Sequence, residues 1–144
     1  MKKIIVPVDF SEMASHALEF AIELNDRVKG EIVLVHVIEM PVGHLNFTGE
    51  VNSSGLESFY TGEFLKATHN KLDLWSKRVI DAGQTVTMHM KYGNAFTNLS
   101  KVIAEEKAHW IVMGSKGASG LREVFIGSNA ERMIRHAECP VFII

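Results

Sequence analysis

Cysteine is almost absent from this chain, since its 144 residues include only Cys139, and no disulfide can therefore form within it. No apolar run approaches the roughly 18 residues that a membrane-spanning helix needs. The apolar run near the start, residues 4–8, is too short for a secretory signal peptide, and no small-residue cleavage site follows it. These absences argue against secreted and membrane-spanning proteins, and we expect a soluble cytoplasmic protein.

An excess of positive charge is also lacking, because 15 Lys and Arg residues face 17 Asp and Glu residues, giving a formal net charge of −2. Proteins that bind nucleic acid independently of sequence present a basic face, which this composition does not supply. Hydrophobic residues make up 47% of the chain, enough to bury a core. We expect one domain over residues 1–144 that binds no nucleic acid and no membrane.

Metal-ligand spacing is missing as well. The seven histidines are scattered, with no H-x-x-x-H or C-x-x-C pattern, so the sequence predicts no protein metal site. His36 interrupts a continuous apolar run, and we expect a hydrogen-bonded core residue there.

Regular elements follow one another in a strict alternation. Apolar runs predict strands at residues 4–8, 32–38, 85–92, 110–113 and 140–144, while helical spacing predicts helices after Ser11, over 56–82, after Asn94 and from about 128. In the second helix we expect Phe64, Leu72, Trp75 and Val79 to face inward. The strand at 85–92 alternates polar and apolar residues, as edge strands do, and residues 39–55 form a long loop. This order predicts an α/β fold with an open parallel sheet and helices on both faces.

Four glycines separate the fourth predicted strand from the last predicted helix, at positions 114, 117, 120 and 127. Ligands of open α/β sheets bind beyond the carboxyl ends of the strands, where this stretch begins. Glycine permits close backbone approach, and a helix N-terminus attracts anions. Gly127, Ser128 and Asn129 therefore form a candidate phosphate cradle, with Lys116 and Arg122 as countercharge. By composition alone, a surface loop with Ser128 as a helix cap explains the pattern equally well.

Known phosphate loops do not match this stretch. The sequence contains neither the G-x-x-x-x-G-K-[S/T] loop nor a G-x-G-x-x-G turn after the first strand, which argues against P-loop ATPases and ordinary nicotinamide dehydrogenases. Asp9 follows the first strand, which we expect to neighbour the fourth. Its carboxylate can accept hydrogen bonds from an adenine amino group or a ribose hydroxyl, although a local turn residue is an equal alternative. Met113 lines such a pocket or merely fills the core.

The spacing Gly114-x2-Gly117-x9-Gly127-Ser128 resembles the ATP-binding signature G-x2-G-x9-G-[S/T] of the universal stress protein family. The opening residues 3–12, the strand residues 33–38 and the ending Cys139-Pro-Val141 also resemble that family, in register over the whole chain. The resemblance implies a Rossmann-like, five-stranded parallel sheet of order 3-2-1-4-5. It also implies a stress-response module that binds ATP, and Mg²⁺ bridging the phosphates is compatible with it.

The resemblance further assigns a nucleotide site and a dimer interface. Adenine would be held by Pro7, Val8, Asp9 and Val37. The ribose and phosphates would lie along the segment Gly114, Ser115, Lys116, Gly117, Ala118, Ser119 and Gly120. The phosphates would also contact Gly127, Ser128, Asn129 and Ala130. Met113 is added from the residue-level reasoning. An apolar edge strand must be covered or paired, so Val141, Phe142 and Ile143 predict a homodimer, a pairing that the family also implies. Cover by a helix is the alternative.

Three functions from different classes remain at this level. The first is a nucleotide-binding signalling module with little or no hydrolysis, because no general base is evident beside the phosphates. The second is a slow metal-dependent ATPase, although no second carboxylate motif lies near the glycines. The third is an interaction protein that needs no nucleotide and uses the dimer surface and the long loop.

Overall fold

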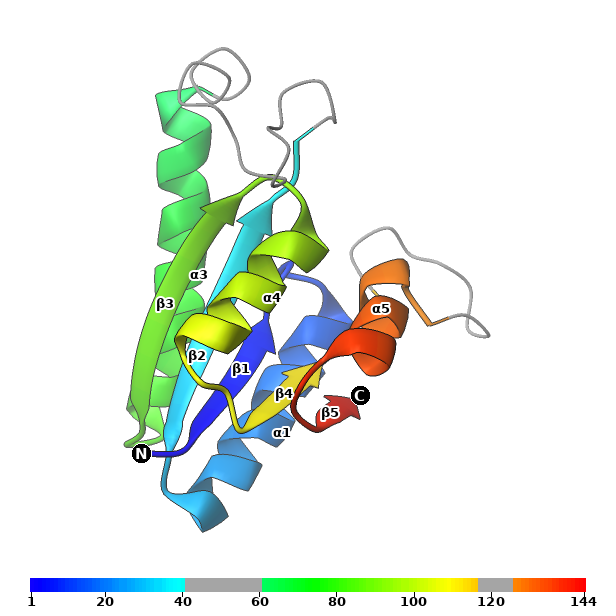
Figure 1. The fold of residues 1–144 in the computed structure, drawn as a ribbon. Coiled ribbons are helices and arrows are strands. Elements are labelled where there is room, and N and C mark those ends of the chain that lie inside the picture. The colour runs from blue at the N-terminus through cyan, green and yellow to red at the C-terminus, as the bar shows by residue number, and fades with distance from the viewer. Residues whose placement is uncertain (41–60, 117–125) are drawn as a thin grey trace.

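The structure, a computed structural model, describes residues 1–40, 61–116 and 126–144 (Figure 1). Its elements run in the order β1 (Lys3–Pro7), α1 (Glu12–Val28), β2 (Glu31–Ile38), α3 (Gly62–Asp81), β3 (Thr85–Tyr92), α4 (Ala95–Glu105), β4 (Trp110–Met113), α5 (Ser128–His136) and β5 (Val141–Ile143). Most of the predicted loop at 39–55 and the predicted start of the helix at 56 lie outside the described residues. No helix in the described ranges is long and apolar enough to span a bilayer.

The five strands form one parallel sheet in the order β3-β2-β1-β4-β5, which confirms the predicted fold class and strand order. β1 lies at the centre, and its residues pair with β2 from Lys3–Glu31 to Pro7–Val35. On its other side β1 pairs with β4 through Ile4–Trp110 and Ile5–Ile111. β3 is an edge strand, as its alternating sequence predicts, and β5 forms the opposite edge.

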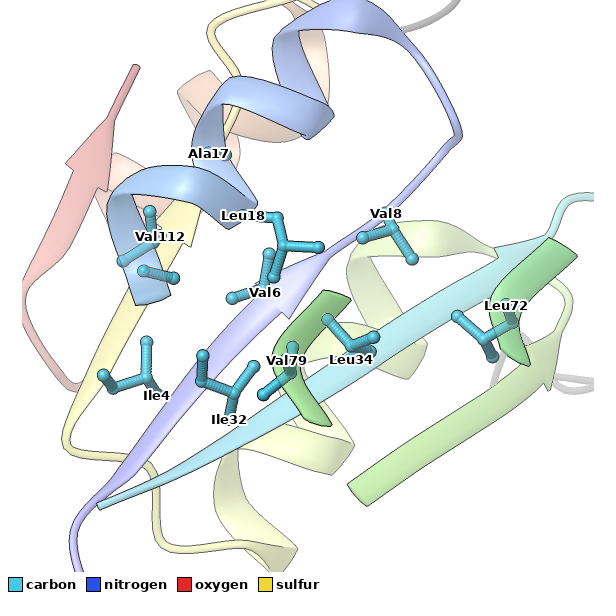
Figure 2. Packing of buried hydrophobic residues seen from close by; sticks show 11 residues of the cluster. Ile4, Val6, Val8, Ala17, Leu18, Ile32, Leu34, Leu72, Val79 and Val112 are labelled. Carbon is cyan, nitrogen blue, oxygen red and sulfur yellow. The ribbon is translucent and has the colours of Figure 1, made fainter. Parts of the chain in front are cut away.

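Helices cover both faces of the sheet because side chains alternate along each central strand. One face packs Ile4, Val6, Ile32 and Leu34 against α1 and α3, as Figure 2 shows, with Leu18 and Val79 among the buried helix residues. The other face packs Ile5, Val33, Val35 and Ile111 against α4 and α5. Since the central strands are buried on both faces, they read as continuous apolar runs in the sequence.

Local signals place the helix starts. Ser11 caps α1 by accepting a hydrogen bond from the Ala14 amide at 3.2 Å, and Asn94 caps α4 by accepting one from the Thr97 amide at 3.0 Å. Both caps are as predicted. Short polar side chains of this kind satisfy amide groups that have no partner inside the helix.

One predicted core residue is wrong. Phe64 leaves 45% of its surface exposed, whereas Leu72 and Val79 of the same helix are buried as predicted and Trp75 packs against their cluster. Phe64 lies in the first turn of α3, and Figure 1 shows that turn extending past the end of β3. Helical periodicity gives the direction of a side chain but not whether the sheet reaches far enough to cover it.

Candidate functional site

A cleft of about 510 Å³ opens at the carboxyl ends of β1 and β4, the edge of the sheet at which open α/β folds place their ligands. Its lining comes from the ends of the strands and from the first turns of helices. The lining residues are Pro7, Val8, Asp9, Ala14, Val35, Val37, Glu39, Asn94, Ala95, Leu99, Met113, Gly114, Ser115, Lys116, Gly127, Ser128, Asn129, Ala130 and Arg132.

The structure brings the predicted site residues together as far as it describes them. Twelve of them line this one cleft: Pro7, Val8, Asp9, Val37, Met113, Gly114, Ser115, Lys116, Gly127, Ser128, Asn129 and Ala130. Gly117, Ala118, Ser119, Gly120 and the predicted countercharge Arg122 lie outside the described residues.

The two ends of the glycine-rich stretch meet. The Gly127 amide donates a hydrogen bond to the Ser115 carbonyl at 2.7 Å, so the residues after β4 and the start of α5 share one wall of the cleft. Gly114 is also required by packing, because a Cβ at this position would lie 2.9 Å from the Met13 backbone. The absence of a side chain at Gly114 therefore lets α1 pack against the end of β4 and leaves the cleft open above it.

Among the described residues, no side chain caps the N-terminus of α5. Side chains cap α1, α3 and α4, whereas the N-cap of α5, Gly127, makes no side-chain cap hydrogen bond. Ser128 and Asn129 belong to the first turn, and the first amide groups of a helix have no carbonyl partner within it. Together with the partial positive charge of the helix end, they form a surface suited to an anion.

Charged side chains of both signs surround the cleft. Lys116 and Arg132 supply positive charge, and Asp9 and Glu39 supply negative charge. Within the described part of the chain, neither cation makes an ion pair. The guanidinium of Arg132 lies instead 4.0 Å from the centroid of the Phe96 ring, an arrangement that fixes its plane while its donors stay available.

The inner wall of the cleft is apolar. Val35, Leu99 and Ala130 are 1%, 3% and 2% exposed, and Met113, at 6%, lies beside them in the same core cluster. Met113 therefore both fills the core and lines the cleft. A flat, uncharged ring could displace water from such a wall, while the polar rim contacts charged groups.

Asp9 has a local role as well as a place in the cleft. Its Oδ1 accepts a hydrogen bond from the Ser11 amide at 3.0 Å, the turn contact that the sequence left as an alternative. A carboxylate has two oxygens and about four acceptor positions, so this turn contact by itself does not occupy the whole group.

His36 lies directly behind this segment. Its Nδ1 is 2.7 Å from the Val8 carbonyl oxygen, which confirms the expected hydrogen-bonded core residue. Burial lowers the pKa of His36 below its ordinary 6.5, although the Val8 hydrogen bond and the Asp9 carboxylate act in the opposite direction. The Lys71 ammonium adds to the lowering of this pKa. His36 is therefore neutral at pH 7.

Sequence reasoning missed seven lining residues: Ala14, Val35, Glu39, Asn94, Ala95, Leu99 and Arg132. A signal existed for three of them. Glu39 and Asn94 follow the carboxyl ends of β2 and β3, where this fold binds ligands. Arg132 comes four residues after Ser128, and residues at that spacing share a helix face. Among the described residues, no group of three His, Cys, Asp or Glu side chains could hold a metal ion.

Comparison with known proteins gives a consistent family. A model of the universal stress protein family matches residues 1–144. Universal stress protein MJ0577 of Methanocaldococcus jannaschii is 29% identical, over 99% of this chain and 94% of that protein. Its solved structure has a TM-score of 0.82 at 27% identity, covering 99% of this chain and 94% of that one. A universal stress protein of Archaeoglobus fulgidus, solved in complex with dAMP, has a TM-score of 0.73 at 20% identity over 100% and 98% of the chains, which shows a shared fold.

Protonation of His36 should lower stability at acid pH. Because its folded-state pKa is lowered, the unfolded chain binds more protons between that pKa and 6.5, so the unfolding free energy falls as pH decreases below about 6.5. We expect the His36 ring signals to titrate with a midpoint below 6.5 in NMR spectra. Urea denaturation at about pH 7.5 and about pH 5.5 should show a larger loss for the wild type than for His36→Gln. A midpoint at or above 6.5 would contradict this account.

Proposed function

The chain belongs to the universal stress protein family, and from this premise we propose that its cleft binds ATP. In this proposal the whole of residues 1–144 acts as one nucleotide-binding domain. Occupancy of the cleft alters its rim and so reports the energy or stress state of the cell. Little or no hydrolysis accompanies binding.

The observation that carries the proposal is the N-terminus of α5, which no described side chain caps and which lies beside an apolar wall. Gly127 makes no side-chain cap, Ser128 and Asn129 follow it, and Lys116 lines the same cleft. A triphosphate matches the amide donors and the positive charge, and a purine ring matches the wall formed by Val35 and Leu99. The two halves of the cleft therefore fit the two halves of a nucleotide.

Adenine is the base that the polar groups favour. The Asp9 carboxylate can accept a hydrogen bond from a 6-amino group. Val37 also lines the cleft, and in this proposal it lies beside the ring, as the family resemblance implies. The dAMP complex of the Archaeoglobus fulgidus protein supports the idea that this fold accommodates an adenine nucleotide. If Mg²⁺ accompanies ATP, it would take oxygen ligands from the phosphates and water and would offset their negative charge.

The lining offers little for phosphate hydrolysis. Asp9 and Glu39 are its only carboxylates among the described residues, and Asp9 already accepts the Ser11 amide. A water-activating base must lie within hydrogen-bond reach of the attacking water. We place Asp9 at the base of the nucleotide, away from the terminal phosphate. The competing function, a metal-dependent ATPase, would need turnover of at least about 1 s⁻¹ to count as an ordinary enzyme.

The native protein should retain ATP through purification. We expect anion-exchange chromatography of the heat-denatured protein to release ATP from the wild type and none from Gly127→Trp, whose indole would occupy the space beside Ser128. Recovery of ADP or AMP alone would support the ATPase instead. No nucleotide, together with no heat on titrating millimolar ATP, would refute the proposal and favour the interaction protein that needs no nucleotide.

Arg132 should contribute to binding through the phosphate charge. We expect Arg132→Gln to weaken ATP binding about three- to tenfold in calorimetry, with adenosine binding unchanged, because one charge-assisted contact is lost. The matched control is Arg135→Gln, on the same helix, whose side chain pairs with Glu131 at 2.9 Å. Equal weakening by both variants would indicate a general effect of net charge and contradict a role for Arg132.

We further propose a homodimer through β5, which lies at the sheet edge with Val141, Phe142 and Ile143. The Ile144 amide donates to Met113 and its carbonyl accepts from Ser115, so the even-numbered residues bond to the β4 side. In a parallel ladder the alternate residues, among them Ile143, turn their backbone groups outward.

A proline at position 143 would remove one outward donor and keep the bonds to β4. We expect light scattering at tens of micromolar to give a dimer for the wild type and for Ile143→Ala, and a monomer for Ile143→Pro. The alanine variant controls for loss of the Ile143 side chain. A monomeric wild type would contradict the dimer.

A further inference from the structure

Phe10 has an unusual backbone conformation next to the cleft. Its φ is 63°, in the left-handed region that bulky residues rarely adopt. It directly follows Asp9, which lines the cleft. Strained conformations of this kind persist only where the surrounding structure fixes them, and they gather at functional sites.

Three side chains from two other elements hold the Phe10 ring. The His36 ring of β2 lies 4.6 Å away between centroids, with a 38° angle between the planes. The Trp75 ring of α3 meets it edge-on at 5.6 Å and 78°. The ammonium of Lys71 lies 5.8 Å from its centroid. Together these contacts seat the ring and so maintain the positive φ.

The residue on the other side of Asp9 is held as firmly. The Val8 amide donates to the Val35 carbonyl at 2.9 Å, and the Val8 side chain is 4% exposed. The Val8 carbonyl lies 2.7 Å from His36 Nδ1. Because a carbonyl can only accept, Nδ1 must carry the proton. His36 therefore contacts both neighbours of Asp9, one by a hydrogen bond and the other by its ring.

We propose that Phe10 and His36 are positioning residues that direct the Asp9 carboxylate at the base of the nucleotide and so make the cleft prefer a 6-aminopurine to a 6-oxopurine. Asp9 is one of the described residues that line the cleft, whereas Phe10 and His36 are not. In this proposal Phe10 and His36 therefore act through Asp9. This inference rests on the proposed function and identifies the device that sets its base specificity.

The chemistry of the two bases provides a readout. The 6-amino group of ATP donates to a carboxylate, whereas ITP presents a carbonyl oxygen at the same position and would be repelled. The triphosphates of the two nucleotides are identical, so loosening of the phosphate site changes both affinities equally. A change in the direction of the Asp9 carboxylate, which faces the 6-position in this proposal, would change their ratio.

The test compares ATP and ITP binding by calorimetry in four variants. Phe10→Leu removes the ring, Phe10→Tyr keeps it, and His36→Phe keeps a ring against Phe10 while losing the donor to Val8. The matched control is Trp110→Leu, since the Trp110 ring also carries a lysine, Lys2 Nζ at 5.3 Å, but lies at the opposite end of the sheet.

We expect the ATP-to-ITP affinity ratio to fall at least about fivefold in Phe10→Leu and His36→Phe, because a misdirected carboxylate no longer distinguishes the bases. Phe10→Tyr and Trp110→Leu should keep the wild-type ratio, although Trp110→Leu loses stability. An unchanged ratio in both Phe10→Leu and His36→Phe, or a wild type that binds ATP and ITP equally, would overturn this inference and leave nucleotide binding intact. A wild type that binds neither nucleotide would overturn the proposed function and the inference together.

Discussion

The pairing of β1 with β4 in the middle of the sheet is the constraint on which the rest of the structure depends. It joins the two halves of the chain through Ile4–Trp110 and Ile5–Ile111. β2 and β3 build outward on one side of β1, and β5 builds outward from β4 on the other. The connections on the two sides of this junction run in opposite directions along the sheet, so the carboxyl ends of β1 and β4 border an opening between helices. The cleft occupies that opening.

The same junction brings together groups that are far apart in the sequence. From β1 come Pro7, Val8 and Asp9, and from the far side of the glycine-rich stretch comes the first turn of α5. The hydrogen bond from the Gly127 amide to the Ser115 carbonyl closes that stretch at its base. Two residues that line the cleft are also needed for packing. Gly114 allows α1 to approach the end of β4, and Met113 belongs to the core cluster. A change at either position alters the shape of the cleft through the fold.

Much of this could be predicted from the sequence. Periodicity and β-branched runs located the elements, and Ser11 and Asn94 located two helix starts, because these signals are local. The alternation of strands and helices indicated a parallel sheet, whereas the strand order came from the family resemblance. Twelve of the predicted site residues gather in one cleft because they lie at or just after the carboxyl ends of strands or at the start of a helix.

What could not be predicted depends on lateral neighbours. The exposure of Phe64 depends on how far the sheet extends beneath α3. The orientation of the Arg132 guanidinium depends on its contact with Phe96, a residue of another helix. The left-handed conformation of Phe10 depends on His36 and Trp75, and no residue-level preference indicates it. Each of these features depends on packing between segments that are far apart in the sequence.

If the first turn of α5 binds the phosphates of ATP, the amide chemical shifts of that turn must change during an ATP titration. We expect large, saturable shifts for the amides of Ser128, Asn129 and Ala130, and smaller shifts for the amide of Val37. When adenosine replaces ATP, the amides of α5 should show no comparable change. Unshifted amides at the start of α5 in the presence of millimolar ATP, or saturable shifts confined to another surface, would contradict phosphate binding by this turn.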